Sequence, residues 1–533
     1  MKAVTGAIQA QDRMLAKTRY RLQTASPRKP SVWERITSSD TGTLILLGLV
    51  VVVLHVATNG RYGFHRDELQ TFNNARHLAW GYVEYPPLIA FLGRLQLELF
   101  GTSLRGFRFF PALAQGLVLV LAGLAARELG GKREAQLVAA LAVGIGGNSL
   151  FQGSFLSYTS IDYLWWTVVA YFVIRLLKND DPRWWVAIGA AIGLGMMTKY
   201  TISFLVLGIV GGVLLTPVRR YLRSPWLWYG VALTLMVMLP NIVWQVQHDF
   251  VSLNYLKSIH ARDVSWGRTN GFLLNQLWKC ANPVVLPLWC GGLWYLFAVP
   301  EGKRYRMLGW MYVIPLAAFL VAKGRDYYLA PAYPMLLAAG AVWGETWLRS
   351  LSAGWATTVR RTTWQTLAWA GLAAAAVTLP LAPPNSAWWR LAEGTHGNFN
   401  YQFGWPELAA TVAKIRDSLP AQEQAKIGIL AGDDGEAGAA NLYGGPYGLP
   451  LAISGMNSNW LRGYGHPPPE TVIAVGMDRD FIYRNFESCE QVDHLTNPYR
   501  IENQSIDGYA DVFVCRHLRQ PWPDFWEHFR YYG

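Results

Sequence analysis

The protein is a chain of 533 residues in which 52% of the residues are apolar, only 15% are charged, and Trp and Tyr number 25 and 26. This composition excludes an ordinary soluble protein of that length and predicts a polytopic α-helical membrane protein. The formal net charge of +12 does not indicate a nucleic-acid partner, because the basic residues gather in short segments between apolar runs.

Residues 1–42 form a basic segment that precedes the first apolar run. That run begins too late for a cleaved signal peptide with its short charged leader, so we expect a retained anchor and a cytoplasmic N-terminus. Without organelle-targeting features, the inner (plasma) membrane of a bacterium is the simplest location. The basic residues of this segment include Lys17, Arg19, Arg21, Arg28, Lys29 and Arg35.

Apolar runs recur through residues 43–384 and predict about eleven transmembrane helices. Their expected bounds are 43–58, 110–127, 135–151, 162–177, 184–198, 201–217, 226–244, 283–299, 307–322, 328–347 and 364–381. Basic clusters occupy every second connection, which is the positive-inside pattern, and they also attract anionic lipid headgroups. The clusters are Arg127, Lys132, Arg133; Arg175, Lys178, Arg183; Arg219, Arg220, Arg223; Lys303, Arg304, Arg306; Arg349, Arg360 and Arg361. An odd number of spans then places residues 385–533 on the exterior face.

The first exterior connection, residues 59–109, is predicted to contain a helix that lies on the membrane surface. Asp67 and Asn74 share one face at helical spacing, and the segment also offers a modest apolar stripe. The proline pair at 86–87 ends the helix, since proline cannot continue one. Residues 245–282 are likewise interpreted as an amphipathic surface segment.

Asp67 and the adjacent Glu68 are charges beside hydrocarbon, which are costly and usually functional. Desolvation by lipid is expected to raise the pKa of Asp67 and make it a better proton acceptor, so Asp67 is the first candidate for a general base. The structural alternative is that Asp67 caps the following helix and pairs with Arg66. Glu68 is expected to position this loop or its neighbours.

Further charged residues lie at the exterior ends of later spans. Asp162 is a second acidic candidate, and with Asp67 it could bind an acceptor or a divalent cation. Lys199, Lys323 and Arg325 are cations that break the positive-inside trend. They are either anchors that snorkel to the interface or ligands of a phosphate group, which requires fixed positive charge.

The exterior histidines His65, His77, His248 and His260 lack the tight spacing of a metal site. They are interpreted as surface or acceptor-site residues. The metal requirement therefore stays open, with a divalent cation as one alternative.

The segment from residue 385 onward is expected to form an exterior α/β domain. Helical patterns cover 406–419 and 436–442, and strand patterns cover 427–431, 471–475 and 511–515. The Gly-Asp-Asp-Gly run at 432–435 is interpreted as a strand-to-helix turn capped by Asp. Cys489 and Cys515 are either joined by a disulfide, which an oxidising exterior permits, or are free buried thiols.

A set of motifs runs through nearly the whole chain. The motifs are Gly-Phe-His-Arg-Asp67-Glu68-Leu, Arg76-His-Leu-Ala-Trp-Gly-Tyr-Val-Glu-Tyr-Pro-Pro-Leu88, Ser160-Ile-Asp162, Met197-Thr-Lys199-Tyr, Lys323-Gly-Arg-Asp-Tyr-Tyr-Leu-Ala-Pro331 and His396-Gly-Asn-Phe-Asn-Tyr-Gln-Phe-Gly-Trp-Pro406. Together they resemble the bacterial polyprenyl-phosphate-dependent membrane glycosyltransferases related to dolichyl-phosphate-mannose protein mannosyltransferases and lipid A aminoarabinose transferase.

The resemblance implies a GT-C-like fold and transfer of a hexosyl or pentosyl group. The donor would be a polyprenyl-phosphate sugar, and the acceptor hydroxyl would belong to a glycan, a lipid or a protein on the exterior face. By this likeness Asp67 is the base of an inverting single displacement and Asp162 is the second acidic residue. The residues expected to contact donor phosphate are Lys199, Lys323 and Arg325. The residues expected to support the substrate site are Glu68, Glu84, His65, Tyr327 and Tyr328.

One departure from the resembled family concerns the donor. Where the aminoarabinose transferase has Glu-Lys-Pro, this chain has Glu84-Tyr85-Pro86, so a phosphate-contacting lysine is lost and the sugar cannot be carried over. The extra exterior repeat domain of the protein mannosyltransferases is also missing. Competing hypotheses are a lipid-linked sugar transporter or flippase, which predicts polar groups at mid-membrane in two related halves, and a non-catalytic membrane scaffold.

Overall fold

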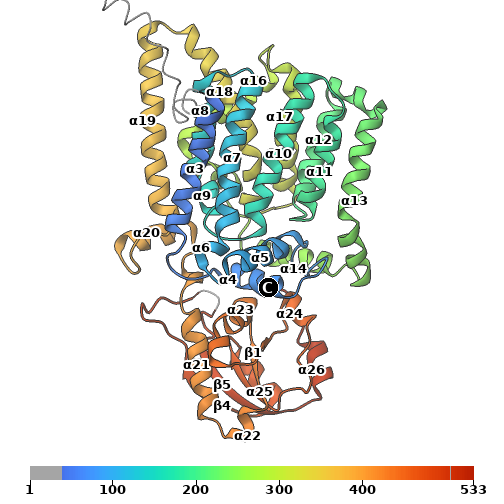
Figure 1. Cartoon of the computed structure of the whole chain (residues 1–533), viewed down its shortest axis with the longest axis vertical. Helices are drawn as coiled ribbons and strands as arrows, with labels where there is room; N and C mark the ends of the chain where they lie inside the picture. The colour runs from blue at the N-terminus through green and yellow to red at the C-terminus, as the bar shows by residue number, and fades with distance from the viewer. Residues whose placement is uncertain (1–38, 504–505) are drawn as a thin grey trace, which may run out of the picture.

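The structure is a computed structural model that describes residues 39–503 and 506–533. A helical bundle occupies one half of the molecule and a C-terminal α/β domain the other, with short helices between them (Figure 1). The C-terminus of the chain lies at this boundary. The basic residues expected on the cytoplasmic side before residue 39 lie outside the described residues.

Each expected span overlaps a helix of the bundle, except that the span expected at 135–151 is divided between two helices, α8 and α9. The helices are α3 (Asp40–Thr58), α7 (Phe109–Glu128), α8 (Arg133–Gly144), α9 (Gly147–Gln152), α10 (Tyr158–Asn179), α11 (Trp184–Met196), α12 (Ile202–Leu214), α13 (Pro225–Gln247), α16 (Leu286–Phe297), α17 (Arg306–Val321), α18 (Tyr333–Ser350) and α19 (Ala353–Thr378). In the described chain, four helices are long and apolar enough to cross a membrane, or up to six if each of two bent pairs is one span. The multi-pass membrane fold is therefore confirmed, whereas the number of eleven spans is not.

The basic clusters meet at one end of the bundle. Lys178 Nζ lies 3.0 Å from a carboxylate oxygen of Glu128, and Arg220 pairs with Asp180. Arg304 donates a hydrogen bond of 2.6 Å to the carbonyl oxygen of Leu177. Clusters far apart in the sequence thus share the end that lies away from the C-terminal domain.

The C-terminal domain contains a mixed sheet of five strands in the order β2-β1-β3-β5-β4. The strands are β1 (Ile427–Ala431), β2 (Ala452–Ile453), β3 (Thr471–Val475), β4 (Phe486–His494) and β5 (Asp511–Leu518). The helices are α21 (Trp405–Ser418), α22 (Ala421–Gln424), α23 (Asp434–Tyr443), α24 (Asn457–Trp460), α25 (Arg479–Asn485) and α26 (Trp522–His528). The α/β prediction is confirmed, with β1 and β3 at their expected bounds. Cys489 and Cys515 face each other across β4 and β5 and form a disulfide.

Short helices cover the end of the bundle that faces this domain. They are α4 (Arg66–Arg76), α5 (Leu88–Phe100), α6 (Leu104–Phe107), α14 (Val251–Ser265), α15 (Phe272–Asn275) and α20 (Ala387–His396). The surface helix expected near Asp67 is α4. Its apolar stripe does not face lipid, because Leu69 and Phe72 are buried in one core with Trp405 and Ile429 of the C-terminal domain.

Helix α4 and helix α23 pack at very short distance. A Cβ atom added to Gly438 would lie 2.6 Å from the carbonyl oxygen of Leu69, so only glycine permits this contact. The other face of α4 is fixed by Glu68, whose carboxylate receives hydrogen bonds of 2.9 and 2.6 Å from Arg108 at the start of α7. Both side chains are almost completely buried, at 0% and 1% exposure. The two halves of the molecule therefore share α4.

We expect Glu68→Gln to destabilise the protein strongly, because it leaves the guanidinium of Arg108 buried without its counter-charge. Breaking one partner of a buried ion pair costs about 3–5 kcal/mol. The melting temperature of purified protein in detergent should fall markedly. Glu98→Gln is the matched control, since Glu98 pairs with Arg94 on an exposed surface of α5 and such pairs contribute about 0–1 kcal/mol. An equal melting temperature for both variants would contradict the structural role of Glu68.

Candidate functional site

A polar cavity of about 140 Å³ lies between the helical bundle and the C-terminal domain. Its walls come from α4, from the loop before α5, from the start of α10, from the connection between α11 and α12, from α14, from the segment between α17 and α18, and from α23. The backbone links two of these walls, because the amide of Leu88 donates a 2.9 Å hydrogen bond to the carbonyl of Met197. The lining residues used below are Arg66, Asp67, Glu84, Tyr85, Tyr158, Lys199, Tyr255, Arg262, Arg268, Arg325, Tyr327, Tyr328 and Asp434.

Asp67 points one carboxylate oxygen at its neighbour and leaves the other available. Arg66 donates hydrogen bonds of 3.3 and 3.2 Å from Nε and Nη2 to Oδ1. Oδ2 accepts no hydrogen bond from the part of the chain that the structure describes. The residue sits in the first turn of α4, where His65 caps the helix by accepting a hydrogen bond from the Asp67 amide at 3.1 Å. Asp67 thus presents a free acceptor atom to the cavity.

The expected increase in the pKa of Asp67 is wrong. Burial does act to raise its pKa, but the charge of Arg66, the charge of His65 and the hydrogen bond from Arg66 together outweigh burial and lower it. The carboxyl is therefore ionised at neutral pH. The predicted ion pair with Arg66 is present, and it is compatible with an open Oδ2 rather than an alternative to it.

Lys199 lies on the wall across from α4 inside a ring of aromatic side chains. Its amine is 4.8, 5.2 and 4.3 Å from the ring centroids of Tyr158, Tyr327 and Tyr328. The residue is 8% exposed, and its amine makes no hydrogen bond to any described residue. Burial lowers the pKa of Lys199, which the charge of Asp162 partly opposes. A buried amine that faces a cavity without an acceptor is suited to an anionic ligand.

Asp162 does not reach the cavity surface. It is 2% exposed in the first turns of α10, and its Oδ2 accepts a 3.0 Å hydrogen bond from Thr201 Oγ1. Thr201 and Lys199 belong to the same connection between α11 and α12. The structure therefore brings Asp162 to the site as a neighbour of Lys199 and not as a group that contacts the space itself.

Arg325 lines the cavity but is already engaged. Its guanidinium donates to both carboxylate oxygens of Asp263 at 2.5 and 2.6 Å. Arg268 lies 3.6 Å from the same carboxylate, and Arg262 lies 3.9 Å from it. Asp263 thus gathers an arginine of α14, one from the segment after it and one from the connection after α17 into one basic wall.

Some predicted site residues are not brought together. Lys323 is exposed, has a left-handed backbone (φ 49°) and does not line the cavity, although Arg325 does. His65 and Glu68 lie behind Asp67, where they cap α4. Among the residues that the structure describes, no three His, Cys, Asp or Glu side chains are arranged to hold a metal ion.

The C-terminal domain contributes residues that the sequence patterns did not single out. Asp433 caps α23, as expected for this turn, but the next residue, Asp434, lines the cavity. Arg462 reaches Asn74 of α4 and Asn459 of α24 through its guanidinium. The only sequence signal was the pair of aspartates after β1, which was assigned to the turn alone.

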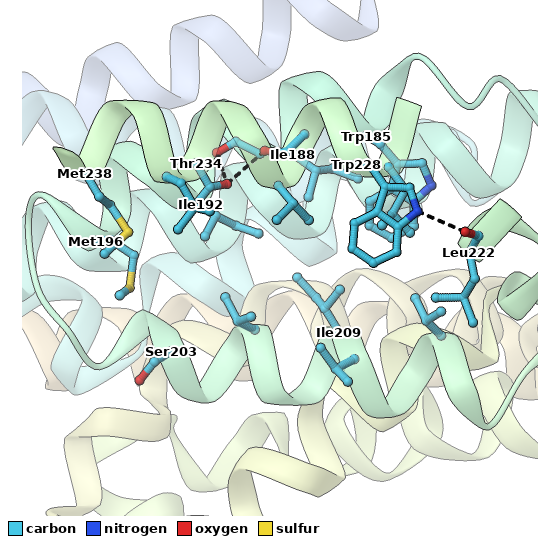
Figure 2. Close-up of a pocket in the computed structure, with 18 of the residues that line it drawn as sticks. Trp185, Ile188, Ile192, Met196, Ser203, Ile209, Leu222, Trp228, Thr234 and Met238 are labelled. Carbon is cyan, nitrogen blue, oxygen red and sulfur yellow. Dashed lines mark hydrogen bonds between the residues drawn. The ribbon is translucent and has the colours of Figure 1, made fainter. Parts of the chain in front are cut away.

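A second cavity, of about 430 Å³, is almost wholly apolar and lies among α11, α12 and α13. Figure 2 shows Met196, Ser203 and Met238 at one of its ends and Trp185, Leu222 and Trp228 at the other. Met196 ends α11 and Ser203 lies in the first turn of α12, so the connection that carries Lys199 joins the two helices at that end. The apolar cavity thus approaches the polar one at Lys199.

Comparisons with known proteins agree with the resemblance expected from the motifs. Residues 84–244 match the family described as dolichyl-phosphate-mannose-protein mannosyltransferase. Lipid A galacturonosyltransferase RgtD of Rhizobium johnstonii is 26% identical over 283 residues, which cover 51% of this chain and 58% of the relative. Undecaprenyl phosphate-alpha-4-amino-4-deoxy-L-arabinose arabinosyl transferase 1 of Pseudomonas fluorescens is 27% identical over 305 residues, 51% of each chain. The matched stretches thus span about half the length of these relatives.

The fold also matches a solved structure. ArnT from Cupriavidus metallidurans, bound to undecaprenyl phosphate, superposes with a TM-score of 0.55 at 17% identity and covers 89% of this chain and 98% of that one. The same protein in the apo state gives a TM-score of 0.54. The GT-C-like fold predicted from the sequence is therefore confirmed.

We expect Lys199→Met to weaken binding of a phosphate-bearing probe by about 10-fold to 100-fold, since a hydrogen bond to a charged group contributes about 1.5–3 kcal/mol. A short-chain isoprenyl phosphate titrated against purified protein, with tryptophan fluorescence as readout, measures the affinity. Lys323→Met removes an exposed lysine of the same neighbourhood and should leave the affinity unchanged. If Lys323→Met weakened binding of the isoprenyl phosphate and Lys199→Met did not, the assignment of Lys199 to the phosphate site would be refuted.

Proposed function

We propose that the protein is a glycosyltransferase that moves a sugar from a polyprenyl-phosphate donor to an acceptor hydroxyl. One observation carries the proposal: an ionised carboxylate with a free oxygen, Asp67, and a buried amine without an acceptor, Lys199, line the same cavity. A base and an anion site are the parts that displacement of a phosphate leaving group requires. The galacturonosyl and arabinosyl transferases among the relatives support this reaction class.

The donor's lipid tail is proposed to occupy the apolar cavity shown in Figure 2. A polyprenyl chain needs an apolar path that ends at the phosphate site, and the cavity among α11, α12 and α13 ends at the connection carrying Lys199. The solved relative with this fold holds undecaprenyl phosphate. Burial of the polyprenyl tail in this cavity would contribute to the affinity for the donor whichever sugar the donor carries.

In the proposed reaction Asp67 Oδ2 takes the proton of the acceptor hydroxyl. The acceptor oxygen attacks the anomeric carbon, a new glycosidic bond forms, and the bond from that carbon to the phosphate oxygen breaks. Lys199 and the guanidinium of Arg325 stabilise the negative charge on the departing polyprenyl phosphate. Asp162 positions Lys199 from behind, and a single displacement inverts the anomeric configuration.

The proposed orientation places the cavity and residues 385–533 outside the bacterial inner membrane and the basic end of the bundle in the cytoplasm. The positive-inside pattern supports it, because the basic clusters meet at the far end of the bundle. The acceptor then is a glycan, lipid or protein of the envelope.

Asp67→Asn is expected to lower sugar transfer by about 10²-fold to 10⁴-fold, the contribution of a general base. Purified protein and synthetic polyprenyl-phosphate donors, with envelope extracts as acceptor, provide the assay, and Glu98→Gln on the exposed face of α5 is the control. Equal transfer by both variants would rule out Asp67 as the base. Absence of transfer by the unsubstituted protein would favour a transporter or a scaffold.

Arg66→Gln is expected to move the acid limb of the kcat/KM profile to higher pH. Burial raises the pKa of Asp67 and Arg66 opposes it, so removal of Arg66 leaves burial less opposed and protonates the base at a pH where the native carboxyl is still ionised. Rates measured between about pH 4 and 8 test this, with Arg94→Gln as the control for loss of an exposed arginine. An unmoved acid limb would contradict the assignment of Arg66.

A further inference from the structure

Two further carboxylates line the cavity. Glu84 precedes α5 and is 8% exposed, and Asp434 begins α23 of the C-terminal domain and is 5% exposed. Neither of them makes an ion pair with a described residue within 4.0 Å. They are therefore buried, charge-bearing groups that hydrogen bonds alone hold in place.

Neutral side chains hold both carboxylates. Asn74 and Ser458 donate hydrogen bonds of 2.6 and 2.5 Å to the two oxygens of Glu84. Asn457 and Asn459 each donate a 2.6 Å hydrogen bond to Asp434. Ser458 and both of these asparagines belong to α24, so one short helix of the C-terminal domain fixes both acids.

The phenol of Tyr255 lies close enough to both acidic and basic groups of the cavity for their charges to affect its pKa. Burial raises the pKa of Tyr255, and the charges of Glu84, Asp434 and Asp67 raise it further while Arg325 opposes them. All of these groups line one cavity. The cavity thus contains both cationic and anionic groups, and Arg66 lies beside the acidic ones, because a Cβ atom added to Gly435, next to Asp434, would lie 2.6 Å from Arg66 Cγ.

The lone amine of Lys199 indicates where an anionic part of a ligand binds. Its side chain is more than nine-tenths buried, it faces the cavity, and its amine has no hydrogen-bond acceptor in the described chain. A sugar linked to a phosphate held there extends away from the basic wall. Glu84 and Asp434 are the acidic residues besides Asp67 in the polar lining that is left for the sugar, which also includes Gln70 and Tyr85.

We infer that Glu84 and Asp434 form the sugar-recognition wall of this cavity and that the donor sugar presents hydroxyl or ammonium groups to it, not a carboxylate. Carboxylates accept hydrogen bonds from hydroxyl and ammonium groups, and each has about four acceptor sites. A uronic acid would bring a further negative charge into a buried acidic wall, which is costly. This inference rests on the proposed glycosyl transfer and specifies its substrate class.

The state of the acids supports the same conclusion. Burial raises the pKa of both carboxyls, and the charge of Glu84 raises the pKa of Asp434 further. Arg462, whose guanidinium contacts Asn74 and Asn459, lowers the pKa of Glu84. Both increases show that the surroundings disfavour negative charge on this wall, so a further carboxylate from a ligand would be costly, whereas hydroxyl or ammonium donors would stabilise the ionised acids.

The test compares short-chain polyprenyl phosphates that carry a neutral hexose, an aminopentose or a hexuronic acid. The unsubstituted protein should use the neutral or the amino donor at least about 10-fold better than the uronic donor. Asp434→Asn should raise KM for the preferred donor by about 10-fold to 100-fold and reduce that preference, since it removes the charge of one acceptor. Asp480→Asn, an exposed aspartate of the same domain, is the control that leaves both values unchanged.

The affinity for sugar-free polyprenyl phosphate distinguishes contact of Asp434 with the sugar from a role in holding the cavity together. If Asp434 contacts the sugar, Asp434→Asn leaves this affinity unchanged while the KM of the sugar donor rises. The inference would be overturned if the unsubstituted protein preferred the uronic donor, or if Asp434→Asn left the donor preference unchanged. It would also be overturned if Asp434→Asn weakened the binding of sugar-free polyprenyl phosphate as much as it raised the KM of the sugar donor. Absence of transfer from all three donors by the unsubstituted protein would instead overturn the proposed glycosyl transfer itself.

Discussion

The buried ion pair between Glu68 and Arg108 is the contact on which the arrangement of the cavity depends. Besides the two hydrogen bonds from Arg108, the Glu68 carboxylate accepts hydrogen bonds from the amides of His65 at 2.8 Å and Leu156 at 3.0 Å. These partners belong to the start of α4, the start of α7 and the segment before α10. Because a buried charge is tolerated only when its hydrogen-bonding capacity is filled, this carboxylate holds the three segments in place relative to one another. Two adjacent carboxylates thereby differ in role: Glu68 is fully engaged, whereas Asp67 keeps an open oxygen.

The C-terminal domain is part of the cavity and not an appendage to the bundle. Leu69 and Phe72 of α4 share a buried core with Trp405, and Gly438 of α23 lets the two helices touch. Since burial of this apolar surface depends on both halves, α4 cannot hold its position without the C-terminal domain. The side chain of Asp434 enters the cavity because α23 begins where α4 passes. The same packing that stabilises the boundary therefore supplies an acidic group to the site.

Short-range sequence patterns predicted the helices and strands that contain a continuous apolar run. Apolar runs located the helices of the bundle, and short β-branched runs located β1 and β3 at their bounds. The edge strands were missed: β2 has only two residues, and β4 is largely exposed and polar, so neither carries an apolar pattern. Tertiary context also reversed one physical expectation, because lipid alone would raise the pKa of Asp67 but the neighbouring Arg66 lowers it.

Sequence motifs alone did not predict all of the residues that line the cavity. Arg325 lines the cavity while Lys323, two positions earlier, is exposed, because the left-handed backbone at Lys323 lies in the turn that ends α17. Arg268 has no motif around it, and the Gly-Asp-Asp-Gly run that contains Asp434 indicated only a turn, so only their positions in the fold assign these two residues to the site.

Tyr85 has a neutral side chain at a position where the aminoarabinose transferases were expected to carry lysine. Its hydroxyl receives a 2.6 Å hydrogen bond from Asn74, whose amide also donates to Glu84. A cation in this place would pair with Glu84, whereas tyrosine provides no counter-charge to this buried acid, whose pKa burial raises. In the proposed binding mode, the positive charge that a phosphate requires comes from Lys199 and from the arginines gathered by Asp263. Tyr85 therefore adds no positive charge next to Glu84, which is consistent with the proposed role of this acid in binding hydroxyl or ammonium groups of the donor sugar.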